Sequence, residues 1–214
     1  MSETGVGAKI TPEHFFGSIV PGQFQKNLER LERERDALAK QIGDLRAMRV
    51  SLRVILAGEP PRNFFLNLAD GKLVLGDAPA EPPLVTIEQS EADWAAAVER
   101  EGVGGFDMFS GKTAAPGSMS LTPARAQKLR ALKGSLRLVL TDLPGGEADR
   151  TWSITTRFGD APEGPPTTTM TMKYEDSQAM RSGGLNPQQA FMGGKIKIAG
   201  DMSFAMQLGM AMMG

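Results

Sequence analysis

An internal repeat constrains the fold of this 214-residue chain more than any other feature. A hexapeptide at residues 51–56 (SLRVIL) recurs at residues 135–140 as SLRLVL, an offset of 84 from the first Ser to the second. A Gly-Asp-Ala-Pro-x-x-Pro-Pro segment at residues 76–83 recurs at 159–166, an offset of 83, and two shorter motifs recur at that distance. We therefore expect a unit of about 83 residues to be present twice, each copy building a similar arrangement of strands and helices.

Each copy opens on an alternating strand pattern, with Leu52, Val54 and Leu56 on one face in the first copy. Further strands are expected at 63–68, 72–75, 84–88, 151–158, 167–173 and 195–198. Capping patterns predict helices at 90–98, 122–132, 186–192 and 202–213. An Asp-Gly hairpin signal at residues 70–71 is missing from the second copy, so the two sheets should differ there. This order of elements predicts an α+β fold with mixed or antiparallel sheets and helices on one face.

The repeats follow an N-terminal region with a different pattern. The sequence divides into an irregular segment at 1–22, a long helix at 23–49, a degenerate first repeat at 50–133 and a second repeat at 134–214. Apolar residues of the helix recur at heptad spacing from Phe24 onwards, with Arg35 where one apolar residue is missing. The apolar interaction residues are Leu28, Leu31, Leu38, Ile42 and Leu45. This helix either packs on its own domain or mediates homo-oligomerisation or docking of a protein partner.

The composition excludes several classes of function. With 24 basic and 25 acidic residues the net charge is -1, which argues against a nucleic-acid partner. There is no Cys and a single His, so thiolate chemistry and multi-His metal sites are excluded, and we expect neither a metal nor a cofactor. No apolar run reaches about 18 residues and no signal-peptide pattern opens the chain, so we expect a cytoplasmic protein with at most transient membrane contact.

Two stretches of the second copy resemble the sterol carrier protein 2 (SCP2) family of lipid-binding domains. These are residues 136–146 (LRLVLTDLPGG) and, above all, residues 186–202 (NPQQAFMGGKIKIAGDM). The resemblance covers about 134–214 well and reaches 50–132 only through the repeat, where residues 113–116 (TAAP) replace the Ile-Lys-Ile strand. It implies a mixed α/β layer enclosing an apolar tunnel for a sterol, fatty acid or acyl chain. It implies no catalytic residues, so we expect the protein not to be an enzyme.

Methionines point to the second copy as the binding half. Nine of the 13 Met residues lie at or after Met170. In the last expected helix, Met202, Met206, Met210 and Met213 form one stripe, and both faces of that helix are apolar. Either both faces are core, or the Met face lines or covers a pocket with its adaptable side chains. The predicted apolar pocket consists of Leu138, Leu140, Ile154, Met170, Met172, Phe191, Met192, Ile196, Ile198, Met202, Met206 and Met210.

These patterns predict a non-catalytic lipid binding or transfer protein that holds a sterol-like, fatty acyl or isoprenoid ligand by apolar contact. The alternative is a structural or interaction protein whose SCP2-like units have filled cores and whose N-terminal helix makes the functional contact. A third interpretation is an accessory domain for an enzyme that acts on a quinone or acyl substrate. Apolar contacts do not encode headgroup chemistry, so the sequence leaves the ligand unnamed.

Overall fold

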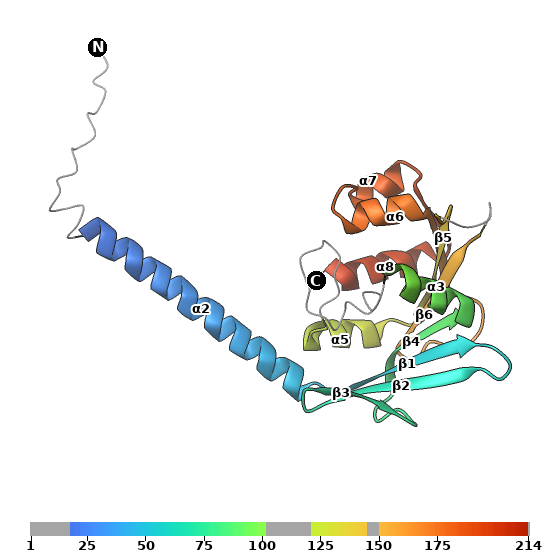
Figure 1. The fold of residues 1–214 in the computed structure, drawn as a ribbon, viewed down its shortest axis with the longest axis horizontal. Coiled ribbons are helices and arrows are strands. Elements are labelled where there is room, and N and C mark those ends of the chain that lie inside the picture. The colour runs from blue at the N-terminus through green and yellow to red at the C-terminus, as the bar shows by residue number, and fades with distance from the viewer. Residues whose placement is uncertain (1–17, 102–120, 145–149, 214) are drawn as a thin grey trace, which may run out of the picture. The chain divides into compact units, whose positions relative to one another are not determined.

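A computed structural model describes residues 18–101, 121–144 and 150–213, and Figure 1 shows its fold. The chain divides into two compact units, Met1–Asp44 and Leu45–Gly214. In the described part of the chain, no helix is both long enough and apolar enough to cross a membrane.

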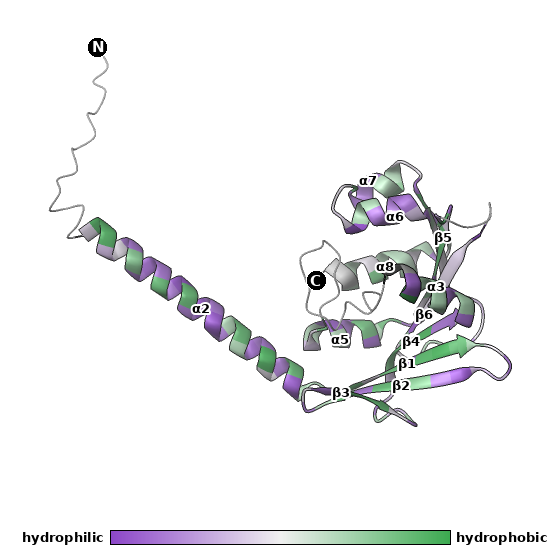
Figure 2. Cartoon of the chain, in the orientation of Figure 1, coloured by the Kyte–Doolittle hydropathy of each residue, from purple (hydrophilic) through white to green (hydrophobic). Residues whose placement is uncertain are grey.

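The first unit consists, in its described part, of most of helix α2, which spans Val20–Ala47. The helix begins three residues before the expected start at residue 23, since Pro21 fits the first turn of a helix, where no intrahelical N–H bond is lost. None of its residues is buried. Figure 2 shows apolar residues recurring along α2 between polar ones, as the heptad spacing predicts.

The second unit is built on one eight-stranded sheet with the order β3-β2-β1-β4-β6-β5-β7-β8. Its strands are β1 (Val50–Ala57), β2 (Arg62–Ala69), β3 (Lys72–Gly76), β4 (Pro83–Ser90), β5 (Gly134–Thr141), β6 (Trp152–Phe158), β7 (Thr168–Lys173) and β8 (Ile196–Gly200). The sheet is mixed, because β1–β4 and β5–β7 pair in parallel and the other neighbours pair antiparallel. The expected α+β class with a mixed sheet is therefore confirmed.

The same pattern of strand pairing occurs in both halves of the sheet. β1 lies between antiparallel β2 and parallel β4, and β5 lies between antiparallel β6 and parallel β7. In register, Leu52 faces Val85 across β1 and β4, and Leu136 faces Thr168 across β5 and β7. We expected separate sheets for the two halves, which was wrong. β4 pairs antiparallel with β6, and this pairing gives hydrogen-bond partners to backbone N–H and C=O groups that a free edge would leave unpaired.

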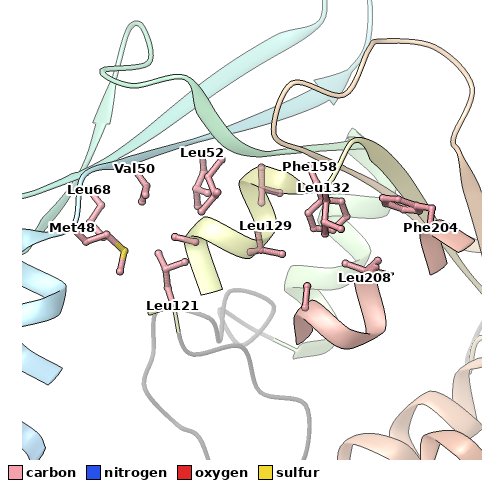
Figure 3. Close-up of a cluster of buried hydrophobic side chains, with 14 residues drawn as sticks. Met48, Val50, Leu52, Leu68, Leu121, Leu129, Leu132, Phe158, Phe204 and Leu208 are labelled. Atoms are coloured by element: carbon pink, nitrogen blue, oxygen red, sulfur yellow. The ribbon is translucent and has the colours of Figure 1, made fainter. Parts of the chain in front are cut away.

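Among the described residues of this unit, five helices cover one face of the sheet, as expected (Figure 1). They are α3 (Glu91–Glu101), α5 (Pro123–Ala131), α6 (Tyr174–Arg181), α7 (Pro187–Met192) and α8 (Met202–Met213). The larger core lies under α5 and α8, and Figure 3 shows its side chains meeting between these helices and the strands. The residues labelled there are Met48, Val50, Leu52, Leu68, Leu121, Leu129, Leu132, Phe158, Phe204 and Leu208.

Helix α8 is held in place at its first turn and by one close approach to the sheet. The Asp201 carboxylate accepts the Phe204 backbone N–H at 3.0 Å and caps the helix as expected. The Phe204 ring lies over Gly134, where an added Cβ would stand 2.6 Å from ring carbons. Only a residue without a side chain fits there, so the glycine that opens β5 sets how closely α8 packs on the sheet.

Candidate functional site

A second, smaller apolar cluster lies on the helix-covered face of β5, β6, β7 and β8. Four cross-strand neighbours form its floor, and we call them the covered row: Trp152, Leu140, Met172 and Ile196. Side chains from α6, α7, the loop between these helices and the loop after β5 pack against this row: Tyr174, Met180, Ala190, Leu185 and Leu143. Leu140, Met172 and Ile196 are buried, so this part of the cluster is closed by the protein itself.

One step along the strands lies a second line of cross-strand neighbours, the central row. It consists of Ile154, Leu138, Met170 and Ile198, one residue from each of β6, β5, β7 and β8. All four are apolar and half-buried. They share a face with the covered row, because side chains two residues apart along a strand point the same way.

Strand β7 shows why the central row is less covered than its neighbours. Its first residue, Thr168, is fully buried and donates from Oγ1 to the Asp201 carbonyl at 2.7 Å, which ties the start of α8 to the strand. Its other end runs directly into α6 at Tyr174, above the buried Met172. Met170 lies between these two attachments, so the central row lies where the α8 cover ends and the α6 cover begins.

Helix α8 presents two different apolar faces. Phe204, Leu208 and Ala211 are buried in the larger core. The methionine stripe is exposed, with Met202, Met206 and Met210 at 43%, 61% and 62% relative exposure. Of the two alternatives for this helix, the one in which both faces are core does not apply, because the Met face is open to solvent.

The end of α7 adds a smaller exposed apolar surface. The helix starts at the expected cap, where the Asn186 side chain accepts backbone N–H groups from Gln188 and Gln189 at 2.8 and 3.4 Å. Ala190 is completely buried, whereas Phe191 and Met192 are 46% and 79% exposed. Figure 1 shows α8 lying between α5 and the α6–α7 pair.

The predicted pocket residues therefore fall into two groups. Seven come together on adjacent strands: Leu138, Leu140, Ile154, Met170, Met172, Ile196 and Ile198. Five lie on exposed helix surfaces: Phe191, Met192, Met202, Met206 and Met210. Sequence reasoning missed Trp152, whose indole N–H donates to the Asp93 carbonyl at 2.8 Å, although its alternation with Ile154 was a usable signal.

The charged groups near the cluster pair with one another. The Asp176 carboxylate is buried in the first turn of α6, and the half-exposed Lys195 ammonium donates to it. At the end of β7, Lys173 pairs with Asp142 at 2.9 Å. The hydrogen bond and charge of Asp142, with the charge of Glu175, raise the pKa of Lys173 above its ordinary 10.5.

The opposite face of the sheet carries a depression of a different character. It has a volume of about 400 Å³, and its lining includes Arg53, Asn63, Glu88 and Arg157. Arg157 is buried and donates to the Pro162 and Gly164 carbonyls at 3.0 and 2.6 Å and to Glu88 at 3.3 Å. These bonds fasten the loop before β7 to the sheet, so the guanidinium has a structural role.

In the part of the chain that the structure describes, no group of three or more Asp or Glu side chains could hold a metal ion. The two rows of the site are apolar, and what they offer a ligand is dispersion contact and exclusion of water.

The C-terminal part of the chain is similar in sequence to known sterol carrier proteins. Residues 117–213 match the SCP-2 sterol transfer family. Sterol carrier protein 2 of Rattus norvegicus is 35% identical over 85 residues, which cover 37% of this chain and 15% of that protein. The Homo sapiens protein is 34% identical over 87 residues, covering 38% and 16%. Among solved structures, the sterol carrier protein domain 2 of Helicoverpa armigera is 31% identical and covers 38% of this chain and 68% of that one, with a TM-score of 0.29.

The match to the SCP-2 sterol transfer family lies in this C-terminal segment of the chain. The matched segment contains both rows of the sheet and the helices α6, α7 and α8. The chain spans about a sixth of the length of the curated relatives it matches.

Proposed function

We propose that this protein binds and transfers a lipid-like molecule, with the central row as the floor of the binding site. The observation that carries the proposal is the line of four half-buried apolar side chains, Leu138, Ile154, Met170 and Ile198, inside the segment that matches the SCP-2 sterol transfer family. The exposed Met face of α8 and the end of α7 supply the remaining apolar contacts when a ligand is bound.

The ligand class follows from the chemistry of these surfaces. The row carries no charge and no hydrogen-bonding side chain, so it selects for apolar bulk: a sterol-like, fatty acyl or isoprenoid chain. About ten methylenes buried at ~0.8 kcal/mol each would contribute ~8 kcal/mol before the entropic cost of association. That amount supports useful affinity without a charged contact.

Methionine suits a carrier that takes ligands of varied shape. Its side chain is unbranched and polarisable, so it adapts to different apolar surfaces. Three exposed Met residues on one face of α8 leave an apolar surface that would gain free energy on being covered. We propose that the protein acts by binding alone, without a catalytic step.

The test is binding of a fluorescent fatty acid and a fluorescent sterol to the full chain and to variants of β7. Met170→Glu places a carboxylate in the central row, and burying that charge under an apolar ligand is costly. We expect at least a tenfold loss of affinity. Met170→Leu, which keeps the volume and polarity, should bind within about threefold of the parent.

Thr171→Glu is the matched control, because residue 171 lies next in the strand and points to the opposite face. It should bind the probes as the parent does, and circular dichroism should show all three variants folded. Equal binding by Met170→Glu and Thr171→Glu would contradict the proposed site, and failure of the parent to bind either probe would contradict the proposed function.

A further inference from the structure

The helix α2 leaves its heptad stripe uncovered. Relative exposures are 67% for Phe24, 38% for Leu28, 47% for Leu31, 59% for Leu38, 50% for Ile42 and 38% for Leu45. Six large apolar side chains on one line of a helix form a surface that binding a partner would stabilise. Their spacing is the 3.5-residue repeat by which one helix packs against another over its whole length.

We propose that α2 pairs with α2 of a second copy of this chain in a parallel, in-register, two-stranded coiled coil. This inference does not rest on the proposed lipid-binding function. The second copy carries the same repeat, so every apolar layer meets an identical one. Leu31, Leu38 and Leu45 hold three of the four d positions and Ile42 holds an a position, the combination that favours two parallel strands.

Arg35 sets the number of strands. It occupies the a position at the centre of the stripe, between Leu31 and Leu38. In a pair of helices its aliphatic stem can cover the layer while the guanidinium reaches water. In a three- or four-stranded bundle, three or four cations would be enclosed together, and burying unpaired charge is strongly unfavourable.

The charges flanking Arg35 favour the parallel direction. Glu34 holds the preceding g position, so in a parallel pair each Arg35 lies beside Glu34 of the second copy, giving two reciprocal ion pairs. In an antiparallel pair that places Leu28 opposite Leu45, Arg35 would instead face Leu38. In the single chain Arg35 bonds to Asp36 at 2.8 Å on the exposed surface, a contact that contributes little and is readily exchanged.

The test is the mass of the full chain by light scattering and sedimentation equilibrium over a range of concentrations. We expect twice the chain mass of 22.9 kDa for the parent. Leu38→Glu should halve that mass, because it places two carboxylates in one apolar layer. Ala37→Glu introduces the same side chain one residue earlier, at an outward position, and should remain a dimer.

A monomeric parent, a trimer or larger assembly, or a Leu38→Glu variant that stays dimeric would overturn the proposal. A near-ultraviolet spectrum matching that of the parent shows that the second unit of Leu38→Glu is folded, since Trp94 and Trp152 both lie there.

Cross-linking tests the direction, and the chain has no Cys to interfere. A single Leu45→Cys variant should form an intermolecular disulfide under mild oxidation, because in a parallel pair residue 45 faces its own copy. Mixing Leu28→Cys with Leu45→Cys chains should give the homodimeric disulfides alone. A predominant mixed disulfide between the two variants would show an antiparallel pair and overturn the parallel arrangement.

Discussion

Gly134 determines how α8 packs on the sheet. A Cβ at this position would stand 2.6 Å from the Phe204 ring, so the ring or the helix must shift. Gly134→Ala should therefore lower the free energy of unfolding by about 1–3 kcal/mol, as overpacking does. In Gly209→Ala, within α8, the new methyl group meets nothing within 4 Å, and the change should stabilise the protein by about 0.5–1 kcal/mol. Urea denaturation of both variants checks this, and an equal effect would contradict the packing of α8.

The buried carboxylate of Asp176 makes Lys195 a stabilising residue. Removing the ammonium in Lys195→Ala leaves a buried acceptor without this partner, which should lower the free energy of unfolding by about 1–3 kcal/mol. Lys197→Ala, two residues along β8 at an exposed position, should change it by no more than about 0.5 kcal/mol. Equal denaturation midpoints for the two variants would show that the Asp176–Lys195 pair contributes nothing to stability.

At the scale of single elements, the two faces of α8 should have different roles: the buried face contributes to stability and the exposed face to ligand binding. Leu208→Ala removes core volume and should lower the free energy of unfolding by about 2–5 kcal/mol. Met206→Gln, on the exposed face, should leave that free energy within about 0.5 kcal/mol and yet weaken binding of a fluorescent fatty acid severalfold. Thermal unfolding and probe titration on the same samples measure both. Unchanged probe binding by Met206→Gln would remove the Met face from the proposed site.

Most elements could be predicted from local patterns, and the central row shows why. Alternation in β5 and β7 placed Leu138 and Met170 on the helix-covered face, and cross-strand pairing then brought them together. Which face of the last helix is buried could not be predicted. Both faces of α8 are apolar, so helical periodicity alone does not say which one packs on the sheet. The buried face is determined by the contact of Phe204 with Gly134, which is far away in the sequence and leaves no local pattern.

At the scale of the whole molecule, the pairing of β4 with β6 joins two strand groups into one sheet. The repeat pattern predicted similar strands in the two copies but not which edge strands pair. Edge pairing depends on which backbone N–H and C=O groups each edge strand leaves without a hydrogen bond. The hydrogen bond from Trp152 to the Asp93 carbonyl links the same two groups. The duplication itself stays a prediction of the sequence.

One continuous sheet should unfold in one transition. The two Trp residues, Trp94 in α3 and Trp152 in β6, report on the two strand groups. Single-Trp variants, Trp94→Phe and Trp152→Phe, should each give a fluorescence transition that coincides with the loss of circular dichroism for the same variant. Two separated transitions within one variant would mean that the groups fold as independent domains.

The central claim is that this protein carries an apolar molecule, and the most direct measurement is mass spectrometry of an organic extract of the purified chain. We predict that a sterol-like, fatty acyl or isoprenoid compound is recovered at a substantial fraction of one molecule per chain, and that Met170→Glu purified in parallel has lost most of it. An empty parent protein that also fails to take up added fatty acid and sterol would contradict the account.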